Sequence, residues 1–230
     1  MRLHELKAFL DSASQADRED LAKLVQCGFG SASHILCDHF QWALCGGLGQ
    51  LFYDGDYKDL VTAVADHEQI DWPSLLQERT WQQLTSVEIE DAIVVTVTRR
   101  IYNELPEGKQ KEIAKELGKT VAKKDFSALL VSGSLMSVAK LSGFGVFKLA
   151  SISVGAISGA LGISIPVMGG YTVLSQAVAL MIGPIGWAAL AIPFLIGINK
   201  NNLPQLIAGV IYVSYLRHKR AFDSLPISAR

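Results

Sequence analysis

Acidic side chains are almost missing from the C-terminal half of this chain. Asp223 is the only acid after position 125, whereas residues 1–125 hold 21 of the 22 acids and 14 of the 21 bases. The net charge is therefore −7 for residues 1–125 and +6 for residues 126–230. Opposite charges favour docking of one half on the other, and the cationic half would also be attracted to anionic lipid head groups.

Charge of either sign is missing from two long stretches. Residues 149–198 and 201–216 contain no Asp, Glu, Lys, Arg or His. A helix that is apolar on all sides must be buried in protein or in lipid. Pro166, Pro184 and Pro193 divide the first stretch into pieces shorter than the roughly 20 residues that a membrane-spanning helix needs, although proline can also kink such a helix. We expect a hairpin-like cluster of short apolar helices inside a protein fold.

Cysteine is scarce, and no CxxC pair occurs. An odd number of cysteines without a disulfide framework is typical of a reducing compartment. Cysteine and histidine are zinc ligands, but their spacing here is unlike that of structural zinc sites, so we expect buried thiols and neither a metal nor a cofactor. The residues concerned are Cys27, His34, Cys37, His39 and Cys45.

Motifs for catalysis and for nucleic-acid binding are also missing. The chain has no GxSxG, HExxH, phosphate-binding loop or dinucleotide fingerprint. Its bases are few and scattered, which argues against a nucleic-acid partner. Glu88, Glu90 and Asp91 lie where a helix should begin, and negative charge is stabilising there for structural reasons. We therefore predict that the protein is not an enzyme; the enzymatic alternative rests on the cysteines and histidines named above.

The N-terminus lacks the apolar core and the cleavage site of a secretory signal, because it is polar within a few residues. We expect a cytoplasmic location, with attachment to a membrane or insertion into it only on activation.

Helical spacing dominates the pattern. Thr85 to Glu88 has the spacing of a capping box ahead of Ile89, Ile93 and Val97, and this outweighs the β-prone stretch at residues 94–98. The fold class predicted is all-α, with amphipathic helices packed around an apolar, Gly-rich, hairpin-like core. Residues 1–125 would form the acidic region and residues 126–230 the apolar, cationic region of one integrated domain. Further helices are expected at residues 3–10, 18–26 with Asp17 as N-cap, 32–45, 57–70, 73–83 and 109–124.

Two sets of residues are candidates for membrane or helix contacts. Gly155 and Gly159 are four residues apart, so another helix could approach their shared face in a membrane or in a water-soluble helix pair. A basic cluster follows the apolar helix expected at residues 203–216, where it suits either anionic lipid or the helix dipole. The remaining candidates are Gly183, Gly186 and Trp187 for packing, and Arg217, Lys219 and Arg220 for anionic lipid.

Two sequence runs carry a resemblance to a known family. Ile-Gly-Pro-Ile-Gly-Trp at 182–187 and Leu-Pro-Gln-Leu-Ile-Ala-Gly-Val-Ile-Tyr-Val-Ser-Tyr-Leu-Arg at 203–217 resemble the closing segment of YaaW-like bacterial proteins. The rest of the chain resembles them in general plan: an acidic helical first part, then a Gly/Ala-rich apolar tail. Where many relatives have IPAVIQ in the last helix, this chain has LPQLIA at 203–208.

The resemblance implies a role in a bacterial anti-phage system of the jumbo phage killer type, in which a YaaW-like protein senses infection and recruits a membrane-damaging effector. We therefore expect a non-enzymatic sensor. Its partners would be a phage protein or a membrane-associated phage structure, an effector subunit, and further copies of itself. The alternative is the pore-forming effector of such a system, which would contact membrane lipid through latent apolar helices.

Overall fold

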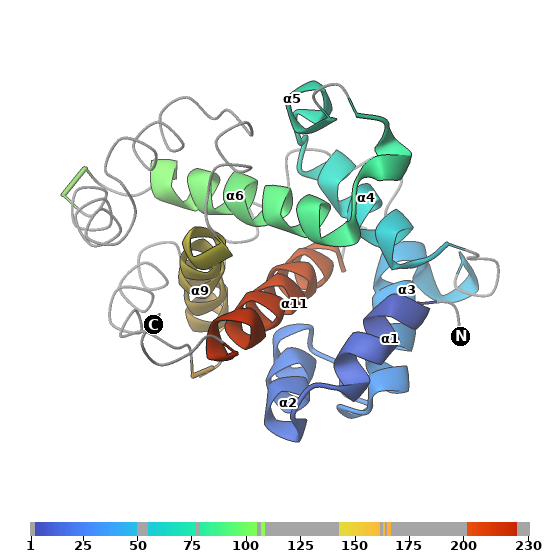
Figure 1. Cartoon of the computed structure of the whole chain (residues 1–230). Helices are drawn as coiled ribbons and strands as arrows, with labels where there is room; N and C mark the ends of the chain where they lie inside the picture. Colours follow the sequence, from blue (N-terminus) through green and yellow to red (C-terminus); the bar gives the residue numbers. More distant parts are fainter. Residues whose placement is uncertain are drawn as a thin grey trace.

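The computed structural model describes residues 3–49, 55–76, 79–104, 107–108, 143–161, 163, 165–166 and 202–224. The elements in this part of the chain are helices, which confirms the predicted all-α class (Figure 1). They are α1 (His4–Asp11), α2 (Gln15–Leu24), α3 (Ser33–Gly49), α4 (Tyr57–His67), α5 (Trp72–Leu76), the 3₁₀ helix η1 (Trp81–Gln83), α6 (Ser86–Glu104), α9 (Gly143–Ala160) and α11 (Leu203–Asp223).

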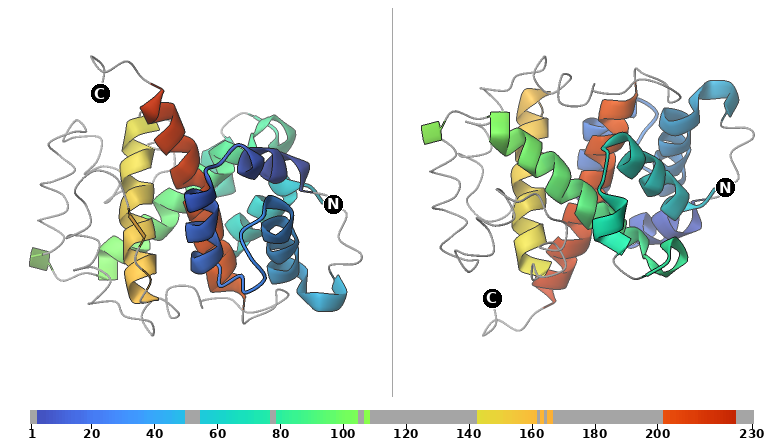
Figure 2. Two further views of the ribbon diagram at one scale, coloured as in Figure 1. Left: turned by 90° about the horizontal axis from the view of Figure 1, so that it is seen from below. Right: turned by 90° about the horizontal axis from the view of Figure 1, so that it is seen from above.

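Helix α11 runs through the middle of the fold. It packs against α9 and α6 on one side and against α2 and α3 on the other, as two further views also show (Figure 2). Residues 206–216 are all buried. Because about 3.6 residues complete a helical turn, this unbroken run is covered on every side. The apolar helix expected at 203–216 is therefore buried in protein in this structure.

Helix α9 is the second apolar helix of the interior. Its residues 145–158 are buried, and Ser153 shares a 2.7 Å hydroxyl hydrogen bond with Thr98 of α6. Gly155 is buried, whereas Gly159 near the C-terminal end of α9 is exposed. The chain between α9 and α11 lies largely outside the described residues, so the hairpin stays a prediction. Among the helices that the structure does describe, none is long and apolar enough to cross a membrane.

Helix α6 begins at the predicted capping box. The Glu88 backbone N–H donates to Thr85 Oγ1 at 3.2 Å, and the Thr85 backbone N–H donates to Glu88 Oε2 at 2.8 Å. Ile89, Ile93 and Val97 are buried on the inner face, and the β-prone stretch at 94–98 is helical. Local capping and helical spacing determine this element.

Several helix boundaries differ from the predictions, and three of them have a clear local cause. The N-cap of α2 is Ser14, because its hydroxyl accepts the backbone N–H of Asp17, which lies inside the helix. Helix α4 ends before Gln69, whose φ of 54° is left-handed. The helix expected at 73–83 is interrupted, because Thr80 is extended and forms a capping box with Gln83 that starts η1. The helix expected at 109–124 lies outside the described residues.

Candidate functional site

A pocket of about 610 Å³ opens where the end of α2, one face of α3 and the start of α11 meet. Gln26, with a φ of 55°, ends the turn after α2, and the following loop carries Phe29 outward. We call this site the aromatic pocket. The described residues that line it are Gln26, Gly28, Phe29, Ile35, Asp38, His39, Trp42 and Gln205.

One face of α3 supplies half of the lining. Ile35, Asp38, His39 and Trp42 follow the spacing i, i+3, i+4, i+7, which places side chains on the same side of a helix. The opposite face of α3 is part of the core, with Leu36, Cys37, Phe40 and Ala43 buried. The inner face of α3 therefore packs in the core, and its outer face lines the pocket.

Two large aromatic side chains of the pocket are exposed. Phe29 keeps 86 % of its surface accessible and Trp42 keeps 37 %, and no other large hydrophobic side chain of the described residues is exposed in this way. Single exposed hydrophobic residues are ordinary, but an aromatic pair beside a concave surface is typical of a binding site. The aromatic pocket is therefore the leading candidate for ligand or partner contact.

The polar atoms of the pocket are tied to its walls. His39 Nε2 lies 2.8 Å from the Val25 carbonyl oxygen, and the His39 ring stacks obliquely on Trp42 with ring centres 5.4 Å apart. Gln205 Nε2 donates to Gln26 Oε1 at 3.1 Å, which joins α11 to the loop after α2. Gln205 Oε1 is shielded from solvent and has no hydrogen-bonding partner among the described residues.

The basic cluster forms a second feature, at the other end of α11. Helix α11 continues through residues 217–220, which we call the basic turn, instead of ending before them. Four consecutive positions point to all sides of a helix, and here each finds a partner on another element. Arg217 contacts Glu5 at 2.9 Å and Glu90 at 3.2 Å, His218 contacts Asp91 at 2.8 Å, Lys219 contacts Asp17 at 2.9 Å, and Arg220 donates to Ser12 Oγ at 2.7 Å.

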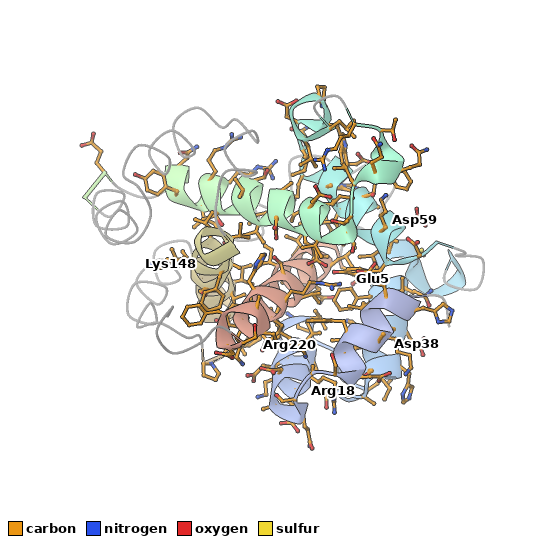
Figure 3. All side chains as sticks on the ribbon, in the orientation of Figure 1. Glu5, Arg18, Asp38, Asp59, Lys148 and Arg220 are labelled. Atoms are coloured by element: carbon orange, nitrogen blue, oxygen red, sulfur yellow. The ribbon has the colours of Figure 1, made fainter. Side chains whose placement is uncertain are left out.

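These contacts affect the predicted lipid-binding residues. Arg217, Lys219 and Arg220 bond to α1, α2, α6 and the turn between α1 and α2, so they would have to leave these partners to reach a lipid phosphate. Figure 3 shows Arg220 among α1, α2 and α11, and Asp38 at the outer edge of the fold. Lipid contact through the basic turn stays a prediction. Of the packing candidates, Gly183, Gly186 and Trp187 lie outside the described residues.

A buried carboxyl lies beside the basic turn. Glu90 is fully buried, and burial raises its pKa to about 8, although the nearby Arg217 guanidinium opposes the shift. Its Oε2 atom and the Tyr57 hydroxyl are both buried, and hydrogen bonding from Tyr57 also opposes the rise in the pKa of Glu90. Strongly shifted carboxyls are common in active sites, but Glu90 does not line the aromatic pocket. Packing of α6 against α4 and α11 accounts for its environment.

Burial disfavours the thiolate form of two of the three cysteines. Burial, with a further contribution from Asp38, raises the pKa of the Cys37 thiol to about 12, so at neutral pH it is a poor nucleophile. Burial also raises the pKa of the Cys45 thiol. Within the described ranges, no cluster of three or more Cys, His, Asp or Glu side chains is arranged to hold a metal ion.

No protein-family model, no curated protein and no solved structure matches this chain.

Proposed function

We propose that the protein is a non-enzymatic sensor of a bacterial anti-phage immune system, which binds a phage protein through the aromatic pocket and recruits an effector. The exposure of Phe29 and Trp42 beside a pocket of about 610 Å³ is the observation that carries the binding role. Buried aromatic anchors supply much of the affinity of protein interfaces, so exposing two of them together suits a docking surface. The anti-phage context depends on the resemblance of residues 182–187 and 203–217 to YaaW-like proteins.

Phage challenge of bacteria that carry the gene together with its neighbours tests this proposal. The double variant F29A/W42A removes both exposed rings, and neither ring belongs to the hydrophobic core. We expect the protection, measured as the fold reduction in plaque number, to decrease at least about tenfold. Trp81→Ala is the matched control, because it removes an aromatic ring from η1, outside the pocket lining. Full protection by F29A/W42A would contradict the proposal, provided that its unfolding temperature equals that of the wild type.

The pore-forming effector is the second candidate; residues 206–216 form a continuous apolar surface that such an effector would have to release from the fold. The ion pair of Lys219 with Asp17 joins the end of this helix to α2, and apolar burial in lipid is favourable at about 25 cal/mol per Å². Dye release from vesicles of phosphatidylglycerol and phosphatidylethanolamine separates the two functions. A sensor should release no dye by itself, whereas an effector should release it and should do so faster when Lys219→Glu weakens the contact with Asp17.

A further inference from the structure

We propose that the aromatic pocket recognises a guanidinium group, namely an arginine side chain in an extended segment of the protein partner. This inference rests on the proposed function for its partner, and it goes further by naming the chemical group that the pocket takes. Three properties of the pocket lead to it: two side chains with hydrogen-bond acceptors, a negative charge, and two aromatic faces.

The first acceptor is a ring nitrogen of His39. A backbone carbonyl only accepts hydrogen bonds, so the Nε2 atom that lies 2.8 Å from the Val25 oxygen must carry the proton. In the neutral ring the second nitrogen, Nδ1, is then an acceptor. The contact with Val25 therefore fixes the tautomer that His39 presents.

The second acceptor is the side-chain oxygen of Gln205. The amide nitrogen of Gln205 is already bonded to Gln26, and its Oε1 atom is buried without a partner among the described residues. Buried polar atoms in folded proteins almost always have a partner. Because Gln205 lines the pocket, a ligand donor that reached this shielded atom would satisfy it.

Charge and aromatic rings complete the complementarity. Asp38 is the one carboxylate among the described lining residues, which include no lysine or arginine. A carboxylate accepts several hydrogen bonds at once and keeps its charge, so a contact that it already makes does not remove it from recognition. The exposed faces of Trp42 and Phe29 can stack on a planar cation.

These features favour arginine over other cations. A guanidinium is planar and has five N–H donors in a fixed fork, so it can bond to acceptors that lie apart while it stacks on an aromatic ring. A lysine ammonium is a compact point charge with three donors and no planar face, so it cannot stack flat on a ring as a guanidinium does. The volume of about 610 Å³ is within the range of ligand pockets and leaves room for the residues next to the arginine, which suits a peptide segment.

Binding of labelled peptide pools to the full-length protein tests the inference. We would use fluorescein-labelled pentapeptide pools with four randomised positions and a central arginine, lysine or citrulline, and measure fluorescence anisotropy. Citrulline keeps the shape of arginine but is uncharged. We expect the arginine pool to bind at least about tenfold more tightly than the citrulline pool and about threefold more tightly than the lysine pool.

Two pocket variants and one control make the result specific. D38N and W42A should each weaken binding of the arginine pool at least about fivefold, and D38N should leave binding of the citrulline pool unchanged. E19Q removes one exposed carboxylate from α2 outside the pocket lining, so it should bind the arginine pool like the wild type. Equal binding of the arginine and citrulline pools, or no binding of any pool, would overturn the inference.

The outcome separates this inference from the proposed function. If phage protection needs Phe29 and Trp42 but the pools bind alike, the pocket does not recognise a guanidinium group, and its role as a docking surface stands. If the arginine pool binds selectively but F29A/W42A still protects, the specificity of the pocket stands and the sensor role is wrong.

Discussion

At the scale of single residues, the acidic cluster at the start of α6 separates into three different environments. Glu88 completes the capping box and pairs with Arg79. Partial burial raises the pKa of Glu88, but the hydrogen bonds from Thr85 and Arg79 outweigh burial and lower it. Asp91 contacts His218 and Ser214 of α11. Glu90 is fully buried next to Arg217. The sequence predicts negative charge at a helix N-terminus, which suits Glu88, but the burial of Glu90 depends on where α11 lies.

We predict that Glu90 makes the protein less stable as the pH rises. Its pKa is near 4.5 in the unfolded chain and about 8 in the fold, so between these values the folded state holds more protons and the free energy of unfolding falls with increasing pH. Burial raises the pKa of Glu68 to about 7, which gives the same sign over a lower range. Between pH 7 and pH 8, the fall in the free energy of unfolding therefore comes mainly from Glu90.

Urea unfolding at pH 6, 7 and 8 measures this effect. Glu90→Gln cannot titrate, so it should remove about 1 kcal/mol of the fall between pH 7 and pH 8, whereas Glu68→Gln should retain it. The same decrease in the wild type and in Glu90→Gln would show that Glu90 is already ionised in the fold.

At the scale of elements, the close approach of α11 to its neighbours depends on one glycine. A Cβ atom at Gly209 would lie 2.5 Å from Phe40 Cζ of α3 and 2.8 Å from Val25 Cγ1. Glycine spacing points to Gly155 and Gly159 in the sequence, but a single glycine in an apolar run has no such pattern. The role of Gly209 follows only from the packing of α11 on α3.

We predict that Gly209→Ala destabilises the fold. Alanine gains up to about 1 kcal/mol over glycine in a helix interior, but overpacking a core costs about 1–3 kcal/mol, and both Phe40 and Val25 are buried. The free energy of unfolding in urea should fall by about 1–2 kcal/mol. Gly28→Ala is the control, since no atom lies within 4 Å of its added Cβ. A Gly209→Ala protein as stable as the wild type would mean that α11 shifts freely against α3.

At the scale of the whole molecule, the division of the sequence into an acidic and a cationic half does not produce two separate bodies in the described residues. Helix α11 of the cationic half lies among α2, α3, α4 and α6 of the acidic half. The basic turn bonds to acids on α1, α2 and α6. The described helices of the two halves therefore share one hydrophobic core.

We predict that residues 1–125 do not fold cooperatively when they are expressed alone. Without α11, the apolar surfaces of α2, α3 and α6 would be exposed, and Glu90 would lose the contact with Arg217. Thermal unfolding followed by circular dichroism should show a broad, uncooperative change for this fragment and a sharp transition for the full chain. A sharp transition of the fragment near the temperature of the full chain would show that the acidic half is a domain by itself.

The sequence alone determined the all-helical class, the start of α6 and the need of α11 for cover on all sides, because helical spacing, capping and the run of uncharged residues act over short distances along the chain. The tertiary structure decided the aromatic pocket, the partners of the basic turn and the packing at Gly209. The outer face of α3 has a readable spacing from Ile35 to Trp42, but Gln205 closes the pocket from 179 positions beyond Gln26. Such contacts depend on how helices pack, and residue spacing within one helix does not predict which distant helix will pack against it.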